Sequence, residues 1–238
     1  SRREGVTLAM TLLAAFKALL ARYTGQDDIL VGMPIANRTR RELEDLIGFF
    51  VNSLALRSDL SGDPPFTELL ARVHATALEA YEHQDLPFER LVDELQPARD
   101  PSRNPLFQVV FAMQNAPSRP LELPGLSIRP LDAATRATRF DLELHVTETP
   151  EGLFAGFCYN RALFDAATIR RLRQHFTALL QGVVADPRMP VSRLPMLLED
   201  ARRTLLEGWN DVTRRFPVDV CLHQRFEAQV DRSPDAVA

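Results

Sequence analysis

The spacing of apolar residues changes repeatedly along this chain, and this change limits the folds that it can adopt. Residues 6–24 carry apolar side chains three and four positions apart, which predicts a helix, and Gly25 follows where that helix would end. Residues 28–34 form a short apolar run that stops at a proline, which is typical of a buried strand. Helical and strand-like segments alternate up to about residue 185. The pattern therefore predicts a mixed α/β layer, followed by a tail that does not belong to it.

The remaining elements follow the same two patterns. Strands are predicted at residues 49–56, 107–113, 140–146 and 153–159. Helices are predicted at residues 65–81, 88–95, 166–184, 197–207 and 222–230. Asp165 is placed to cap the helix that follows it, and Pro87 suits the first turn of the short helix after it. After Asp186 the apolar pattern thins into a segment with three prolines.

Composition excludes several classes of protein. The 28 basic and 32 acidic side chains and a pI near 5.8 argue against a dedicated nucleic-acid-binding protein. No apolar run of about 18 residues is present that could cross a membrane. Cys158 and Cys221 are far apart and lack CxxC spacing, which fits two reduced thiols in the cytoplasm. Because the chain opens at Ser1 and stops within an apolar segment, we expect it to be a piece of a longer protein.

No independent catalytic or nucleotide-binding motif occurs. The chain has neither GxGxxG nor GxxxxGK[ST] nor GxSxG, and its five histidines form no zinc-type pair, so we expect no metal site. Strand alternation places Asp141, Glu143 and His145 on one face of the segment 140–146. Two carboxylates could orient a histidine as a general base, but the polar face of a half-buried strand has the same pattern. The sequence leaves both interpretations open.

Three segments resemble the motifs of one known family. They are IGFFVNSLALR at residues 47–57, HQDLPFE at residues 83–89 and RDPSRNPL at residues 99–106. These segments are similar to the IGxFVNT, (H/N)QDxPFE and RDxSRNPL motifs of the condensation domains of nonribosomal peptide synthetases, and they occur in the same order. The resemblance extends over about residues 5–185.

The resemblance implies a chloramphenicol-acetyltransferase-like lobe, with a mixed sheet and packed helices, followed by an extended linker. In this family two such lobes enclose a tunnel that holds the active site, and the chain resembles the C-terminal lobe. We therefore expect this lobe at residues 1–185, the interdomain linker at 186–218 and the start of an adenylation domain at 219–238. Residues 222–238 resemble the opening segment of adenylation domains, and Trp209-Asn210 resembles a pair common in the linker.

The resemblance also implies a function. Condensation domains form the amide bond between carrier-bound aminoacyl or peptidyl thioesters in secondary-metabolite and antibiotic biosynthesis. The family's HHxxxDG motif belongs at the end of the N-terminal lobe, and no His-His pair occurs here. We therefore expect no catalytic residue in this chain and no activity from it alone. The implied partners are the N-terminal lobe, the adenylation domain and peptidyl carrier domains, which bear phosphopantetheine, with no cofactor bound directly by this chain.

Residues in the first motif are candidates for the tunnel or the lobe interface. Arg57 could pair across that interface with the aspartate of the absent motif, since a buried carboxylate needs a partner. Asn52 and Ser53 could line the tunnel through their amide and hydroxyl groups. Gly48 would permit close approach of the backbone.

The other two motifs supply further candidates at polar junctions near the tunnel. Asp85 could cap the helix after Pro87. The full set from these motifs is Gln84, Asp85, Arg99, Asp100, Arg103 and Asn104. Residues 117–139 occupy the position of a latch segment that crosses to the other lobe in the family.

Two other functions are compatible with these features. The chain could be a noncatalytic module that docks carrier proteins, or part of an acyl-CoA-dependent acyltransferase of the same two-lobe fold. The adenylation-like tail argues against the acyltransferase, and HHxxxDG upstream would argue against the docking module. A heterocyclisation domain differs chiefly in that upstream motif, so the subtype stays open.

Overall fold

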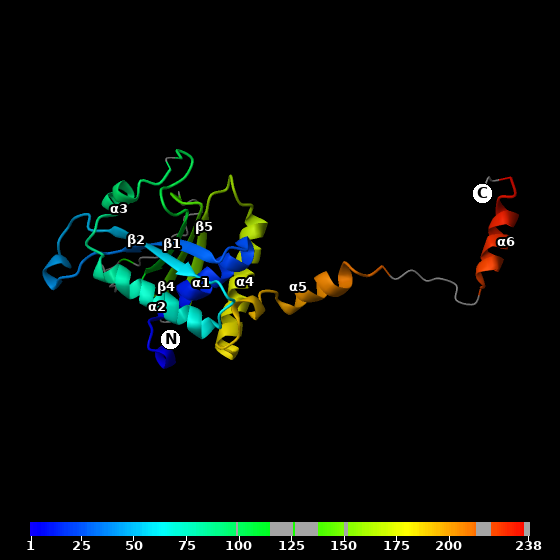
Figure 1. The fold of residues 1–238 in the computed structure, drawn as a ribbon, viewed down its shortest axis with the longest axis horizontal. Coiled ribbons are helices and arrows are strands. Elements are labelled where there is room, and N and C mark those ends of the chain that lie inside the picture. The colour runs from blue at the N-terminus through cyan, green and yellow to red at the C-terminus, as the bar shows by residue number, and fades with distance from the viewer. Residues whose placement is uncertain (99, 115–125, 127–137, 150–151, 213–219, 236–238) are drawn as a thin grey trace. The chain divides into compact units, whose positions relative to one another are not determined.

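The structure is a computed structural model that describes residues 1–98, 100–114, 126, 138–149, 152–212 and 220–235 (Figure 1). The chain divides into two compact units, at residues 1–198 and 199–238. The first unit contains all five strands of the described residues, joined in one sheet. Each unit is described by itself below.

The sheet of the first unit is mixed. Its strands are β1 (Asp28–Ile35), β2 (Asn52–Asp59), β3 (Val109–Gln114), β4 (Leu142–Thr149) and β5 (Gly152–Tyr159). They lie in the order β2-β1-β3-β4-β5. The two outer pairs are antiparallel, whereas β3 runs parallel to both β1 and β4. The predicted α/β fold is therefore confirmed, with parallel strands at the centre of the sheet.

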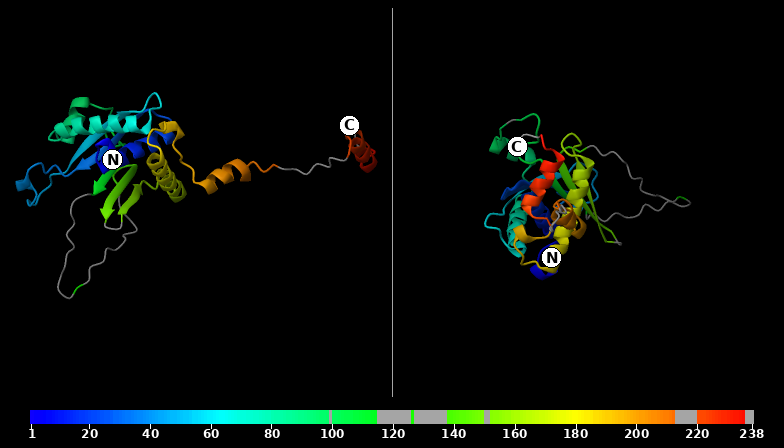
Figure 2. Two further views of the ribbon diagram at one scale, coloured as in Figure 1. Left: turned by 90° about the horizontal axis from the view of Figure 1, so that it is seen from below. Right: turned by 90° about the vertical axis from the view of Figure 1, so that its right-hand side faces the viewer.

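Three long helices cover one face of this sheet: α1 (Leu8–Thr24), α2 (Phe66–Glu82) and α4 (Ala166–Ala185) (Figures 1 and 2). The short α3 (Phe88–Leu95) follows α2, and 3₁₀ turns occupy Arg2–Glu4, Arg41–Leu43 and Val191–Arg193. Thr7 Oγ1 accepts a hydrogen bond from Met10 N at the start of α1, and Gly25 ends α1 with φ of 69°. Asp165 caps α4 as predicted, because its Oδ1 accepts from Thr168 N over 2.6 Å.

An aromatic cluster fills the core between the helices and the sheet. Phe16 of α1 lies 6.5 Å from Phe111 of β3, 6.2 Å from Phe157 of β5 and 6.3 Å from Phe176 of α4, between ring centroids. Phe16 and Phe111 have no exposed surface. Burial of each such side chain contributes roughly 1.5 to 3 kcal/mol to folding. This cluster holds α1 and α4 on the same face of the sheet.

Lys17 is the only lysine of the chain, and its side chain is fully buried in α1. Its Nζ donates hydrogen bonds to Leu56 O over 2.7 Å and to Ser58 Oγ over 2.6 Å. Burial lowers the pKa of Lys17 to about 7, although the nearby Asp28 opposes this shift. The amine therefore links α1 to β2, although its burial costs desolvation free energy.

Strands β2, β3 and β4 begin later than the apolar pattern predicts, β4 at Leu142 instead of residue 140. The pairing of β2 with β1 stops at Asn52 opposite Ile35, so residues 49–51 have no strand beside them and leave the sheet. At β3 the backbone N–H of Phe107 bonds to Pro105 O in a turn, and the strand starts at Val109. At β2 the apolar run therefore extends beyond the end of its partner strand β1.

The first unit extends past residue 185, into the range predicted as linker. Ser192 donates from its N–H over 2.8 Å and from its hydroxyl over 2.6 Å to the carboxylate of Asp63. Arg22 donates to the carbonyls of Val191 and Leu194, whose side chains are buried. Residues 186–198 therefore pack with the first unit, and the linker assignment itself stays a prediction.

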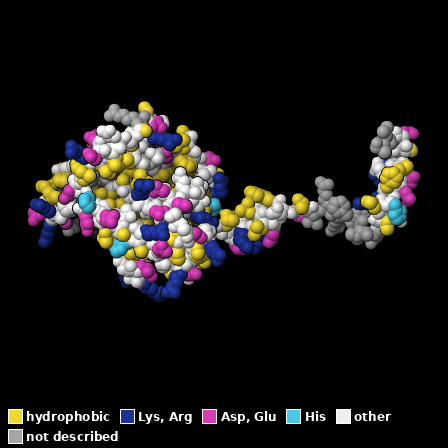
Figure 3. Space-filling view, in the orientation of Figure 1, with side chains coloured by type: hydrophobic (Ala, Val, Ile, Leu, Met, Phe, Trp, Pro, Cys, Tyr) yellow, Lys and Arg dark blue, Asp and Glu magenta, His cyan; other side chains and the backbone are white. Residues whose placement is uncertain are grey.

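The second unit consists of short helices. α5 (Glu199–Arg203) continues into a π turn (Thr204–Gly208), and α6 spans Leu222–Arg232. Cys221 N donates to Gln224 Oε1 at the start of α6. Leu222 and Phe226 of α6 are 85% and 68% exposed, and Figure 3 shows apolar side chains on the surface of both helical segments. No helix in the described part of the chain is long and apolar enough to span a membrane.

Candidate functional site

Asn52 joins the first motif to the second. Its Nδ2 donates to Gln84 O over 2.8 Å and to Leu86 O over 2.7 Å. Its Oδ1 accepts from Ser53 N over 2.9 Å and from Phe88 N over 3.1 Å. An asparagine amide has two donor hydrogens and two acceptor lone pairs, so every hydrogen-bonding position of Asn52 is used. The side chain is therefore a structural connection between β2 and the loop before α3.

This arrangement changes the predicted role of Asp85. Asp85 is exposed, and the N-terminal N–H of α3 at Phe88 bonds to Asn52 instead. Gln84, the other candidate in this motif, donates from its side chain to Tyr81 O over 2.8 Å and so closes the end of α2. The cap of α3 thus comes from β2, and the interpretation of Asp85 as its cap is wrong.

Phe107 connects the second and third motifs. Its ring lies 5.2 Å from Phe88 and 5.6 Å from Phe140, between centroids, and only 3% of the residue is exposed. The ring covers Gly32 of β1, where an added Cβ would lie 2.1 Å from Phe107 Cε2. Only glycine leaves room for this ring at position 32.

The third motif forms a hydrogen-bonded loop. Asp100 Oδ1 accepts from both the N–H and the hydroxyl of Ser102, which lowers the pKa of Asp100 below its usual value. Arg103 lies 3.6 Å from the same carboxylate and is largely exposed. Arg99 lies outside the described residues.

Asn104 connects this loop to the residues just before β3 and β4. Its Nδ2 donates to Arg139 O over 2.6 Å, and its own carbonyl accepts from Gln108 Nε2 over 2.9 Å.

A hollow of about 1260 Å³ lies between this loop and α3, lined by Asp93, Gln96 and the loop residues. The predicted latch at residues 117–139 falls mostly outside the described residues.

Arg57 has a carboxylate partner within the chain. Its Nε lies 2.9 Å from Asp28 Oδ1 and its Nη2 lies 2.7 Å from Asp28 Oδ2, a two-point contact across β1 and β2. Hydrogen bonding to Arg57 lowers the pKa of Asp28. Both side chains are more than half exposed. The predicted pairing of Arg57 with a second lobe therefore stays a prediction.

The loop before β2 exposes apolar side chains. Ile47 is 105% and Phe49 92% exposed, and about half of Leu46 and Val51 is exposed. The guanidinium of Arg38 lies over the Phe50 ring, 4.2 Å from its centroid. Gly48 sits in this loop, where an added Cβ would approach Phe50 Cε2 to 2.9 Å. We call Leu46, Ile47, Phe49 and Val51 the apolar loop.

Glu143 and His145 form the only hydrogen bond between a histidine and a side-chain carboxylate in the described part of the chain. Glu143 Oε2 lies 2.7 Å from His145 Nε2, and Thr138 Oγ1 donates to Glu143 Oε1 over 2.5 Å. Their side chains are 14% and 29% exposed, respectively. Asp141, expected on the same face, has no ion pair with His145. Alternation in the sequence identified this pair, but nothing in the strand pattern indicated Thr138.

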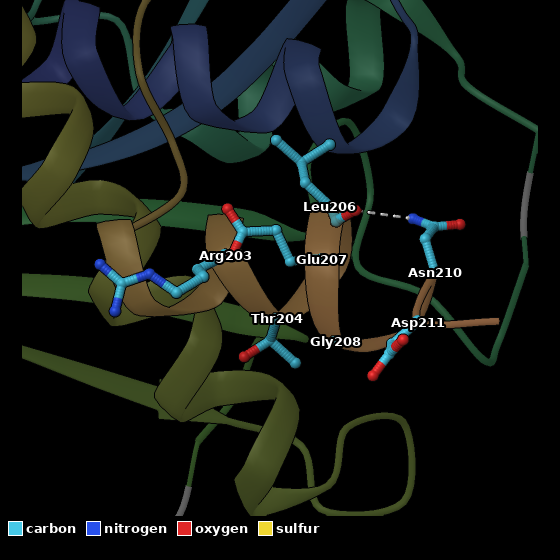
Figure 4. A pocket seen from close by; sticks show the side chains of 7 residues that line it. All are labelled: Arg203, Thr204, Leu206, Glu207, Gly208, Asn210 and Asp211. Atoms are coloured by element: carbon cyan, nitrogen blue, oxygen red, sulfur yellow. Dashed lines mark hydrogen bonds between the residues drawn. The ribbon is translucent and has the colours of Figure 1, made fainter. Parts of the chain in front are cut away.

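A second hollow, of about 570 Å³, belongs to the second unit. Figure 4 shows its lining residues between Arg203 and Asp211, with Asn210 donating to Leu206 O over 3.2 Å. These residues come from α5, the π turn and the residues directly after it, so the hollow is a groove beside this short segment. No group of three or more metal-binding side chains occurs among the residues that the structure describes.

The comparisons with known proteins identify the family. Residues 1–206 match the family model described as "Condensation domain". The chain belongs to the condensation domain family.

One relative of this condensation domain is a component of the linear gramicidin synthase of Brevibacillus parabrevis. The two are 49% identical over 240 residues, which cover 100% of this chain and 5% of the relative. The chain therefore spans only a small part of the length of that relative.

Solved structures match the condensation-domain fold. A complex of the X-domain and OxyB from teicoplanin biosynthesis aligns with a TM-score of 0.72 and 32% identity, over 82% of this chain and 44% of that one. The first condensation domain of the calcium-dependent antibiotic synthetase, in complex with a substrate analogue, aligns with a TM-score of 0.65 and 23% identity, over 83% and 43%. The chloramphenicol-acetyltransferase-like fold class is thereby confirmed.

Proposed function

We propose that this chain is the C-terminal lobe of a condensation domain that joins carrier-bound aminoacyl or peptidyl thioesters through an amide bond. The proposal rests on one observation. The apolar loop is exposed, and this chain covers only 43–44% of the length of the two solved chains described above. Exposed apolar side chains in a cluster mark a contact surface. A second lobe, absent from this sequence, would cover them.

The junction around Asn52 and Phe107 supports a structural role for the three motifs. It connects segments more than 30 residues apart in sequence and leaves no unused hydrogen-bonding position on Asn52. Such a junction would hold the apolar loop and the sheet in fixed positions for the second lobe. Arg57, Ser53 and Gly48 would then lie at the lobe interface, as the resemblance implies.

The proposed partners follow from this role. Peptidyl carrier domains would deliver their thioesters on phosphopantetheine arms, and an adenylation domain would begin at residues 219–238, which include α6. The exposed apolar residues of α6, Leu222 and Phe226, support a further domain beyond the linker. The chain would contribute one wall of the tunnel and no catalytic His-His motif.

A condensation assay with loaded donor and acceptor carriers tests the proposal. The parent synthetase, which would contain this chain and an upstream HHxxxDG segment, should form the amide product. The 238-residue chain alone should form none. Product from the chain alone would contradict the proposal, and so would the lack of product from the parent protein.

A second candidate function is a noncatalytic docking module. The X-domain in the teicoplanin structure is found in a complex with OxyB, and this chain aligns with it over 82% of its length. A parent protein that binds loaded carriers but forms no amide bond in the same assay would favour this candidate.

A further inference from the structure

Asn37 has a buried side-chain oxygen with no hydrogen-bond partner among the described residues. Its Oδ1 is shielded from solvent, although the residue as a whole is only half-buried. The backbone of Asn37 lies in the left-handed region, with φ of 49°, which asparagine adopts more readily than most residues. Buried carbonyl oxygens are almost always bonded in folded proteins, because an unpaired one has lost its hydrogen bonds to water. A donor for this oxygen is therefore missing from the described part of the chain.

Asn37 lies near the start of the segment that carries the apolar loop. Residues 36–51 join β1 to β2 and project beyond the ends of both strands (Figure 1). Among these residues, all of which the structure describes, only Asn37, Arg38, Leu43 and Phe50 are half-buried, and the others are exposed. The unpaired oxygen thus belongs to the small shielded part of an otherwise exposed segment.

Contacts of Arg38 hold this segment in one conformation. Its guanidinium lies over the Phe50 ring, 4.2 Å from the centroid, and its Nη1 donates to Leu43 O. These contacts join the start of the segment to its middle and its end. They leave the four side chains of the apolar loop exposed. The segment is therefore pre-organised, which lowers the entropy lost when a partner covers it.

The partner that would cover this surface is the second lobe of the same domain. This chain covers 44% and 43% of the two solved chains described above, so more than half of their length lies outside the alignment. The proposed function assigns the apolar loop to that lobe, and Asn37 belongs to the same segment. Protein interfaces combine apolar contacts with hydrogen bonds between paired polar groups. The second lobe is therefore the source from which a donor could reach Asn37 once the apolar loop is covered.

We propose that Asn37 Oδ1 accepts a hydrogen bond from an N–H or O–H group of the second lobe. This inference rests on the proposed function. The apolar loop provides contact area, which fixes no direction. The hydrogen bond forms only over a narrow range of distance and angle, so it sets how the two lobes lie against each other. Asn37 is thus a positioning residue for the lobes and takes no part in the chemistry.

Hydrogen exchange of residues 36–51, measured by mass spectrometry in the 238-residue chain and in the parent synthetase, tests the inference. Asn37→Gly removes the acceptor, and glycine adopts the left-handed backbone without strain. In the parent synthetase this variant should speed exchange in the segment about tenfold, because a donor of the second lobe loses its partner. In the chain alone Asn37 has no partner to lose, so exchange should not become faster. Thr39→Gly, at an exposed position two residues away, is the matched control and should have the same effect in both proteins.

The outcomes separate this inference from the proposed function. If the wild-type parent protein forms no amide product, the proposed function fails, and this inference fails with it. If it forms product and Asn37→Gly changes exchange equally in both proteins, the proposed function stands and this inference is overturned, because water or a group of this chain is then the donor. Slower amide formation by Asn37→Gly with unchanged exchange in the parent protein would also overturn it, since the donor would then belong to a substrate.

Discussion

The backbone N–H of Phe88 donates a hydrogen bond to Asn52 Oδ1 over 3.1 Å, although the two residues are 36 positions apart. The same asparagine amide donates to the carbonyls of Gln84 and Leu86. One side chain thus fixes the direction in which the chain leaves α2 and enters α3. Asn52 thus connects the sheet and the first motif to the second motif, and its substitution should disturb both motifs.

Asn52→Asp should destabilise the chain by about 2 to 4 kcal/mol. The substitution replaces a donor with a carboxylate oxygen that faces two carbonyl oxygens, 2.8 and 2.7 Å from the present Nδ2. Urea unfolding followed by circular dichroism measures the change. Asp85→Asn is the matched control in the adjacent exposed loop and should change stability by less than about 0.5 kcal/mol. Equal losses in both variants would show that Asn52 has no special role.

The fold could be predicted where sequence neighbours determine the structure. Alternation in β4 and the Asp165 cap of α4 are local features, and the structure has both. The junction could not be predicted in this way, since the partners of Asn52 are 32 to 36 residues away and three of its four bonds join it to backbone groups of another segment. Local pattern assigned the cap of α3 to Asp85, an acidic residue two positions before Pro87.

The ends of the strands and the partners within the candidate site also could not be predicted from the local sequence pattern. The run at residues 49–51 is apolar, yet these residues lie beyond the end of β1 and have no pairing partner there. For His145, alternation correctly placed Glu143 on its face, but only the structure distinguishes Glu143 from Asp141 as the partner. Thr138, which holds the other carboxylate oxygen, lies before the strand, where no periodicity applies.

Gly32→Ala should destabilise the first unit by about 1 to 3 kcal/mol, as overpacking does. The new methyl group would lie 2.1 Å from Phe107 Cε2, so the buried ring must move away from Phe88 and Phe140. Thermal and urea unfolding measure the loss. Gly156→Ala is a control in the same sheet, since its nearest atom would be 3.8 Å away.

A double-mutant cycle tests whether contact with the Phe107 ring causes the loss of stability in Gly32→Ala. Phe107→Leu removes the ring that meets the new methyl group, so Gly32→Ala should cost less in that background. The same cost in both backgrounds would mean that the ring contact is not responsible.

Lys17 should make stability depend on pH between about 7, the pKa of its buried amine, and 10.5, the ordinary pKa of a lysine. In that range the unfolded chain binds more protons than the folded one, so the free energy of unfolding should rise with pH by up to about 1.4 kcal/mol per unit. Below this range both states are protonated, and the Lys17 contribution is constant. The measurement is the difference between wild type and Lys17→Met in urea unfolding at several pH values. Tyrosines titrate in both proteins and cancel, so a difference independent of pH would contradict the assignment.

Residues 186–198 should be required for full stability of the first unit. Val191 and Leu194 are 5% and 1% exposed, and burial of each side chain contributes roughly 1.5 to 3 kcal/mol. A chain that ends at residue 185 also loses the bonds of Arg22 to the carbonyls of Val191 and Leu194. It should therefore unfold at lower urea concentration than a matched chain that ends at residue 198, which keeps all of these contacts. Equal midpoints would place the end of the folded unit at residue 185, because the contacts made by residues 186–198 would then contribute nothing to its stability.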